Sequence, residues 1–184
     1  MVIELGIGDG QLLEGLINYE NSPNTCYVGI EIDAAQIQKA RDRMTGKNIF
    51  LINESIKKVI PLLPDNCVDH FIFVLPPPKY IDRKMESQWT LLYQKIYKKL
   101  KENGTFTLVT EVTNDLLEPV SNDEFSSWKT WLASIFVSFG FTLREVFNEC
   151  PLLYRSHFLE QFRSDQLRIN IITLILEKPH YKSI

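Results

Sequence analysis

The opening stretch, Met1–Gly10, constrains the fold more than any other part of the chain. Val2 to Leu5 predict a short buried strand, three glycines follow at every second position, and residues 11–17 predict a helix. Glycine lets the backbone turn sharply and lets a ligand approach without meeting a Cβ atom. A strand that passes through such a turn into a helix is typical of the nucleotide-binding corner of a doubly wound α/β fold. The same pattern also suits a tight strand–helix turn that holds no ligand.

An acidic end on the second predicted strand favours a ligand at this turn. Residues 26–33 are apolar and β-branched, and they end in acid. In a βαβ unit this strand end lies beside the ribose of the ligand, and Glu31 follows the last glycine by about 20 residues, as that geometry requires. A carboxylate there accepts charge-assisted hydrogen bonds worth roughly 1.5–3 kcal/mol each. Asp33 has a second interpretation, as the cap of a helix over residues 34–44.

The spacing of the glycines separates two classes of ligand. The dinucleotide fingerprint is Gly-x-Gly-x-x-Gly, and its last glycine would fall on Gln11. This chain has Gly-x-Gly-x-Gly, with Glu4 two residues before the first glycine. With Glu31 in place, the pattern resembles the first two motifs of class I S-adenosylmethionine-dependent methyltransferases. The resemblance implies that the glycine turn faces the methionine part of S-adenosyl-L-methionine and that the second acid holds the ribose.

We therefore expect the cofactor-binding residues at the ends of the first four strands. They are Glu4, Gly6, Gly8, Gly10, Glu31, Ile32, Asn53, Glu54 and Leu75.

The rest of the chain alternates strands and helices, as a Rossmann-like α/β fold does. Further strands are predicted over residues 48–53, 67–75, 105–110, 141–147 and 169–176, and further helices over residues 55–63, 85–101 and 122–139. These elements predict a doubly wound, seven-stranded sheet that is mostly parallel. The last two strands are joined by residues 148–168, which contain no convincing crossover helix. We therefore expect these two strands to pair antiparallel at one edge of the sheet.

Composition predicts one globular domain over residues 1–184. The chain is 45% hydrophobic and 23% charged, which suffices for a buried core. No apolar run approaches the roughly 20 residues of a membrane span, and no charged leader precedes the first strand, so we expect a cytoplasmic protein. The three cysteines and three histidines are scattered and predict no metal site. Because the formal net charge is −3, binding of nucleic acid would have to depend on a local basic patch.

Three consecutive prolines, Pro76 to Pro78, leave the end of the fourth predicted strand. They fix φ and remove the backbone donors, so the loop is either a stiff connector or a rigid wall beside the methyl acceptor. The loop, with residues 63–69 before the strand, resembles the tRNA (guanine-N7)-methyltransferase family, whose loop reads Phe-Pro-Asp-Pro-Trp followed by basic residues. Pro77 stands where that family has aspartate, and Lys79 where it has tryptophan.

This second resemblance implies tRNA or another RNA as substrate and a set of acceptor-side residues. The substrate-binding candidates are Pro77, Lys79, Tyr80, Arg83 and Arg155, and the catalytic candidates are Glu111 and Glu160. Guanine N7 carries a free lone pair and no proton, so its methylation needs no general base. The methylated ring is cationic, and a nearby carboxylate would stabilise the developing charge.

Other functions stay open at the level of sequence. Pro77-Pro78 is also reminiscent of the Asp/Asn-Pro-Pro-Tyr loop of adenine-N6 enzymes, although the polar residue is missing and Tyr80 is displaced by one. A small-molecule methyltransferase would suit the acidic net charge. A further alternative is a cofactor-binding relative without catalysis that serves as a partner or scaffold, with a protein partner or as a homodimer.

Overall fold

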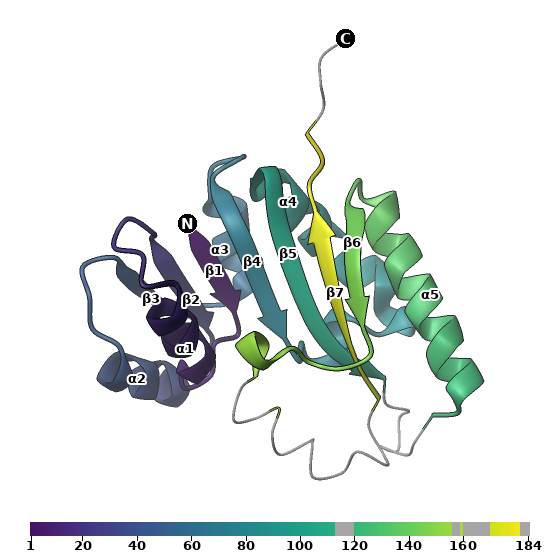
Figure 1. The fold of residues 1–184 in the computed structure, drawn as a ribbon, viewed down its shortest axis with the longest axis horizontal. Coiled ribbons are helices and arrows are strands. Elements are labelled where there is room, and N and C mark those ends of the chain that lie inside the picture. Colours follow the sequence, from purple (N-terminus) through teal and green to yellow (C-terminus); the bar gives the residue numbers. More distant parts are fainter. Residues whose placement is uncertain (113–119, 156–158, 160–169, 181–184) are drawn as a thin grey trace.

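The computed structural model describes residues 1–112, 120–155, 159 and 170–180. Seven strands form one sheet in the order β3-β2-β1-β4-β5-β7-β6 (Figure 1). The strands are β1 (Val2–Leu5), β2 (Tyr27–Glu31), β3 (Ile49–Asn53), β4 (Val68–Val74), β5 (Leu100–Val112), β6 (Thr142–Phe147) and β7 (Asn170–Glu177). The helices are α1 (Gln11–Glu20), α2 (Ala34–Arg43), α3 (Ile56–Val59), α4 (Glu86–Lys99) and α5 (Asn122–Ser138).

The first five strands are parallel, and the order reverses at β1. β1 pairs with β2 on one side and with β4 on the other, and β3 and β5 continue the sheet outward. In such sheets ligands bind outside the carboxyl ends of the strands, at the point where the order reverses. The glycine turn after β1 and the proline loop after β4 both lie at that point.

The last strand is antiparallel to its neighbours, as the sequence predicts. β7 lies between β5 and β6 and pairs antiparallel with both. This arrangement confirms the Rossmann-like, mostly parallel seven-stranded sheet.

Helices cover both faces of the sheet. α1 and α2 lie on one face, and α3 and α4 lie on the other (Figure 1). The ring of Phe136 in α5 packs edge-to-face on Tyr93 of α4, with centroids 4.9 Å apart, and both belong to the core of the second face. Trp89 of α4 is fully buried and donates its indole N–H to the Asp82 carbonyl at 2.8 Å. That bond anchors the segment that follows the proline loop.

Two element boundaries differ from the predicted ones for identifiable reasons. The helix predicted over residues 55–63 ends as α3 at Val59 and continues as a 3₁₀ turn, Ile60–Leu62, because Pro61 has no N–H to donate. β5 begins at Leu100 rather than at residue 105, since its pairing with β4 starts there and then shifts register across a bulge. No helix in the described part of the chain is both long and apolar enough to cross a membrane.

Candidate functional site

The glycine turn joins β1 to α1 and has a positive φ at all three glycines. φ is +71° at Gly6, +55° at Gly8 and +81° at Gly10. A Cβ atom on Gly10 would lie 3.0 Å from the Ala40 Cβ atom and 2.5 Å from the Met44 Cε atom, so this glycine allows α1 and α2 to pack closely. A Cβ atom on Gly8 would meet nothing within 4 Å. The backbone at Gly8 is therefore open to a ligand.

Glu31 connects the end of β2 to the glycine turn. Its Oε2 atom accepts a hydrogen bond from the Gly8 N–H at 3.0 Å, and its Oε1 atom accepts one from the Asp33 N–H at 2.9 Å. Asp33 caps α2 by accepting from the Ala35 N–H at 2.8 Å, which confirms its capping interpretation. Asn53 donates its amide to the Glu31 carbonyl at 2.9 Å. Asn53 therefore fixes the end of β2 and does not line the pocket described next.

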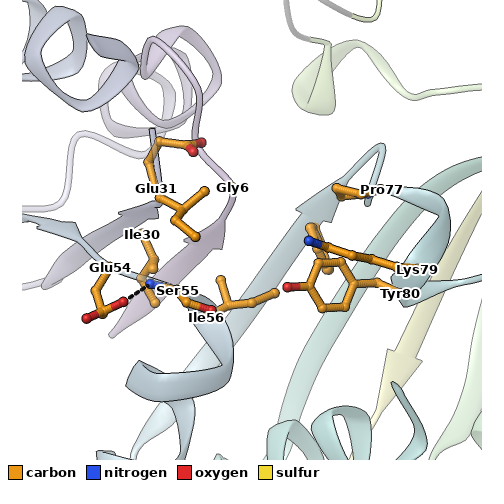
Figure 2. A pocket seen from close by; sticks show the side chains of 11 residues that line it. Gly6, Ile30, Glu31, Glu54, Ser55, Ile56, Pro77, Lys79 and Tyr80 are labelled. Carbon is orange, nitrogen blue, oxygen red and sulfur yellow. Dashed lines mark hydrogen bonds between the residues drawn. The ribbon is translucent and has the colours of Figure 1, made fainter. Parts of the chain in front are cut away.

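A pocket with an empty volume of about 590 Å³ opens beside Glu31 and the glycine turn (Figure 2). Its walls come from the ends of β1, β2, β3 and β4 and from the loops that follow them. Seven of the residues predicted from the sequence line it: Gly6, Glu31, Ile32, Glu54, Pro77, Lys79 and Tyr80.

Four lining residues were not predicted as site residues: Ile30, Ser55, Ile56 and Phe73. Ile30 and Phe73 lie in predicted strands, whereas Ser55 and Ile56 begin the helix predicted over residues 55–63. All four lie within two residues of a predicted site position, so closeness to a predicted strand end is the signal that could have identified them. Which of these side chains face the pocket depends on how the strands and the helix pack together, which the sequence alone does not give.

The proline loop presents Lys79 and Tyr80 to the pocket, across from Glu31 and Gly6 (Figure 2). The Tyr80 ring is only 8% exposed and lies 6.0 Å from the Phe73 ring, centroid to centroid. Burial raises the pKa of its hydroxyl, which hydrogen-bonds with the Ser55 side chain. The ammonium of Lys79 lies 5.3 Å from the centroid of the same ring. Tyr80 therefore forms a fixed wall of the pocket.

Glu4 lies buried beside the glycine turn, with 3% of its surface exposed. The Leu13 backbone hydrogen-bonds with its carboxyl group, while its Oε2 atom has no hydrogen-bond partner. Burial raises the pKa of Glu4 well above its usual value, and the charges of Asp9 and Glu31 raise it further. An acid in this state is costly to the fold when it is ionised.

We predict that Glu4→Gln makes the free protein more stable at neutral pH, by about 1–3 kcal/mol. A carboxyl with a raised pKa holds its proton in the folded state at pH values where the unfolded chain has lost it. The parent should therefore lose stability as pH rises above the usual glutamate range, until it passes the folded pKa. Urea unfolding at several pH values should show this decline in the parent and a flatter profile in the variant. A decline of equal slope in both would contradict the assignment to Glu4.

Four further predicted residues that the structure describes do not line the pocket. Glu111, near the end of β5, is half-buried, its Oε2 atom has no hydrogen-bond partner, and burial raises its pKa. The Arg83 guanidinium lies 5.5 Å from the centroid of the Trp131 ring. The Arg155 Nε atom is buried and has no hydrogen-bond partner among the described residues. Leu75 has a φ of +48°, and its N–H donates to the Val109 carbonyl at 2.8 Å. Glu160 lies outside the described residues.

Two further observations describe the groups that the site offers to a ligand. Within the part of the chain that the structure describes, no three metal-binding side chains cluster. The pocket brings backbone, carboxylate and apolar surfaces together at the ends of parallel strands. That arrangement suits a nucleoside with a polar tail.

Comparison with known families and structures agrees with this geometry. A family model described as a methyltransferase domain matches residues 1–159. No curated protein matches the chain by sequence.

Solved structures with the same fold carry several different activities. The 16S rRNA methyltransferase KamB shares 14% identity with a TM-score of 0.72, covering 97% of this chain and 87% of its own. A Haloferax volcanii complex of the Trm112 methyltransferase activator with a methyltransferase shares 15% identity with a TM-score of 0.66, and the match covers 97% of this chain and 82% of that chain. The geranyl diphosphate C-methyltransferase of Streptomyces coelicolor, solved with Mg²⁺, geranyl diphosphate and S-adenosyl-L-homocysteine, shares 11% identity with a TM-score of 0.62, covering 96% and 70%. At these identities the likeness concerns the fold.

Proposed function

Because this chain belongs to the methyltransferase domain family, we propose that it transfers methyl groups from S-adenosyl-L-methionine to RNA, with guanine N7 of tRNA as the acceptor. One observation carries the proposal. A single pocket joins Gly6 and Glu31 to Lys79 and Tyr80, so the glycine turn and the proline loop face the same space. The glycine turn is part of the motif that resembles a cofactor site, and the proline loop carries the residues proposed to contact the methyl acceptor.

The residues present fit the cofactor. The open backbone at Gly8 leaves room for its methionine part, and Glu31 lies where a carboxylate can accept from the ribose hydroxyls. Ile32 is 70% exposed and lines the pocket, and stacking of the adenine would account for so much exposed apolar surface. When bound, S-adenosyl-L-methionine supplies an already activated methyl group. The protein therefore has to position the acceptor more than to activate it.

Methylation of guanine N7 is favoured by a negative charge near the acceptor ring and requires no general base. Attack by guanine N7 places positive charge on the ring, and the Glu111 carboxylate has a buried oxygen without a hydrogen-bond partner. A cation beside it would lower the raised pKa of Glu111 and keep the carboxylate ionised. Because Glu111 does not line the pocket, this role requires the acceptor ring to extend from the pocket toward the end of β5, where Glu111 would stabilise the product-like charge by electrostatics alone.

A second candidate function is cofactor binding without catalysis, in a protein that acts as a partner or scaffold. The observation that favours it is Pro77, which lines the pocket where the tRNA (guanine-N7)-methyltransferase family has an aspartate. Proline offers no side-chain hydrogen bond to a guanine edge. The Haloferax volcanii neighbour, which forms a complex with an activator protein, is a precedent for this fold in an assembly.

Two measurements separate these functions. Calorimetry with S-adenosyl-L-methionine and, separately, with NAD tests the cofactor, and we expect binding of the first alone. Labelled methyl groups are then offered to total RNA, to protein and to a small-molecule extract, followed by nucleoside analysis. Label in 7-methylguanosine of tRNA supports the proposal. Cofactor binding without methyl transfer favours the scaffold function. Label in the small-molecule extract would indicate a small-molecule acceptor in place of RNA.

A further inference from the structure

A second cavity lies between α3 and α4, next to the pocket. This α3–α4 groove has an empty volume of about 460 Å³ and is lined by Lys57, Gln88, Leu91, Leu92 and Lys95. Leu91 is 59% exposed, so the floor of the groove is apolar and open to solvent. Lys57 comes from α3, and the other four residues come from α4.

Tyr80 connects the groove to the pocket. The ammonium of Lys57, which lines the groove, lies 5.2 Å from the centroid of the Tyr80 ring. The ammonium of Lys79, which lines the pocket, lies 5.3 Å from the same centroid. The ammonium groups of Lys57 and Lys79 therefore lie near the same aromatic ring, one from each cavity, although like charges repel each other at such separations.

Among the described residues, Lys57, Lys79 and Lys95 form no ion pair with an acid. Neighbouring lysines do: Lys58 pairs with Glu54 at 3.1 Å, and Lys99 pairs with Asp65 at 2.7 Å. The chain as a whole has more acidic than basic residues, 23 against 20. Lys39 and Lys47 also form no ion pair with an acid among the described residues, so what distinguishes Lys57, Lys79 and Lys95 is their place around two cavities that meet at Tyr80.

We propose that the α3–α4 groove holds the phosphate backbone of the RNA acceptor, with Lys57 and Lys95 as its phosphate contacts and Lys79 at the border with the pocket. The inference rests on the proposed function, because the RNA chain that occupies the groove is the same chain that carries the methyl acceptor into the pocket. A strand that enters the pocket beside Lys79 meets Lys57 and then Lys95 as it leaves. The apolar floor of Leu91 and Leu92 accommodates sugar and base surfaces.

A polymer fits this path better than a small acceptor does. A small molecule that reaches the pocket leaves the groove empty and gives Lys57 and Lys95 no bound anionic group to contact. An RNA chain carries one phosphate per nucleotide and can therefore contact several lysines in turn, and such contacts position the nucleic acid without reading its sequence. The groove is therefore expected to add affinity for RNA of any sequence.

The test is the double variant Lys57→Gln/Lys95→Gln, compared with the matched control Lys39→Gln/Lys47→Gln. Both control lysines are exposed; Lys39 lies in α2, on the other face of the sheet, and Lys47 lies in the segment that joins α2 to β3. Binding of a fluorescein-labelled single-stranded RNA 20-mer and of unfractionated tRNA is measured by anisotropy from about 50 to 300 mM salt. Calorimetry with S-adenosyl-L-methionine and circular dichroism report that the pocket and fold are intact.

We expect the groove variant to bind both RNAs about 10- to 30-fold more weakly near 0.1 M salt, with a salt slope smaller by roughly 1.4, as for two lost single-strand contacts. Lys57→Arg/Lys95→Arg should retain binding, because arginine keeps the charge. Equal losses in the groove and control variants, or no loss in either, would overturn the inference. So would tight binding of poly-glutamate through the groove while RNA binding is unaffected, because the groove would then hold an acidic protein. Failure of the parent to bind S-adenosyl-L-methionine contradicts the proposed function instead.

Discussion

Replacing Gly8 with alanine is expected to weaken S-adenosyl-L-methionine binding at least 30-fold while costing the fold only about 1–2 kcal/mol. The new Cβ atom meets no protein atom within 4 Å, so packing does not oppose it, and on the proposed function it would enter the space that the methionine part of the cofactor needs. The stability cost comes from the left-handed φ of +55°, which L residues adopt reluctantly. The loss of affinity corresponds to overpacking a close contact by one methyl group, about 2 kcal/mol.

Gly10→Ala is the matched comparison, and its effects should be reversed. The added Cβ atom would lie 3.0 Å from the Ala40 Cβ atom and 3.3 Å from the Ala40 Cα atom, so α1 and α2 must separate. We expect a loss of about 2–5 kcal/mol of unfolding free energy, from backbone strain and overpacking together. Urea unfolding and calorimetry on both variants measure the contrast. If Gly8→Ala binds the cofactor like the parent, the ligand does not approach the turn.

The sequence predicts the fold well because its strongest patterns are local. The strand, glycine turn and helix at the start of the chain lie within about twenty residues, and β7 was placed antiparallel because no crossover helix precedes it. The element boundaries that differ from the predicted ones depend on contacts with neighbouring strands or on local backbone chemistry. β5 extends back to Leu100 because β4 pairs with it there, and that pairing is a tertiary effect.

The candidate site was predicted less completely, for a physical reason. Glu31 and Tyr80 were identified as single residues, but the sequence did not show that Glu31 also holds the Gly8 N–H. It did not show that Tyr80 is buried against Phe73, or that Asn53 hydrogen-bonds to the β2 backbone. These roles depend on which side chains meet across parallel strands. The α3–α4 groove was missed for the same reason, because helix periodicity assigns lysines near Leu92 to a solvated face.

Glu31 has two roles in the structure that one substitution would remove together. Its carboxylate already accepts from the Gly8 and Asp33 N–H groups, so it shapes the turn before any ligand arrives. The side chain also lines the pocket, where it can accept from the ribose hydroxyls. An acid used in this way is pre-organised, and pre-organisation reduces the entropy that binding must overcome.

We therefore predict that Glu31→Ala weakens S-adenosyl-L-methionine binding by roughly 3 kcal/mol, which is more than a hundredfold in Kd, because charge-assisted bonds to the ribose are lost while the turn loosens. Glu14→Ala is the control. Glu14 is a partly exposed carboxylate in the same βαβ unit and pairs with Arg43 at 3.1 Å, so its removal should cost less than about 1 kcal/mol of stability and leave the Kd unchanged. Calorimetry on the three proteins measures the difference. A Glu31→Ala protein that binds within threefold of the parent would show that the ribose lies elsewhere and that this carboxylate only shapes the turn.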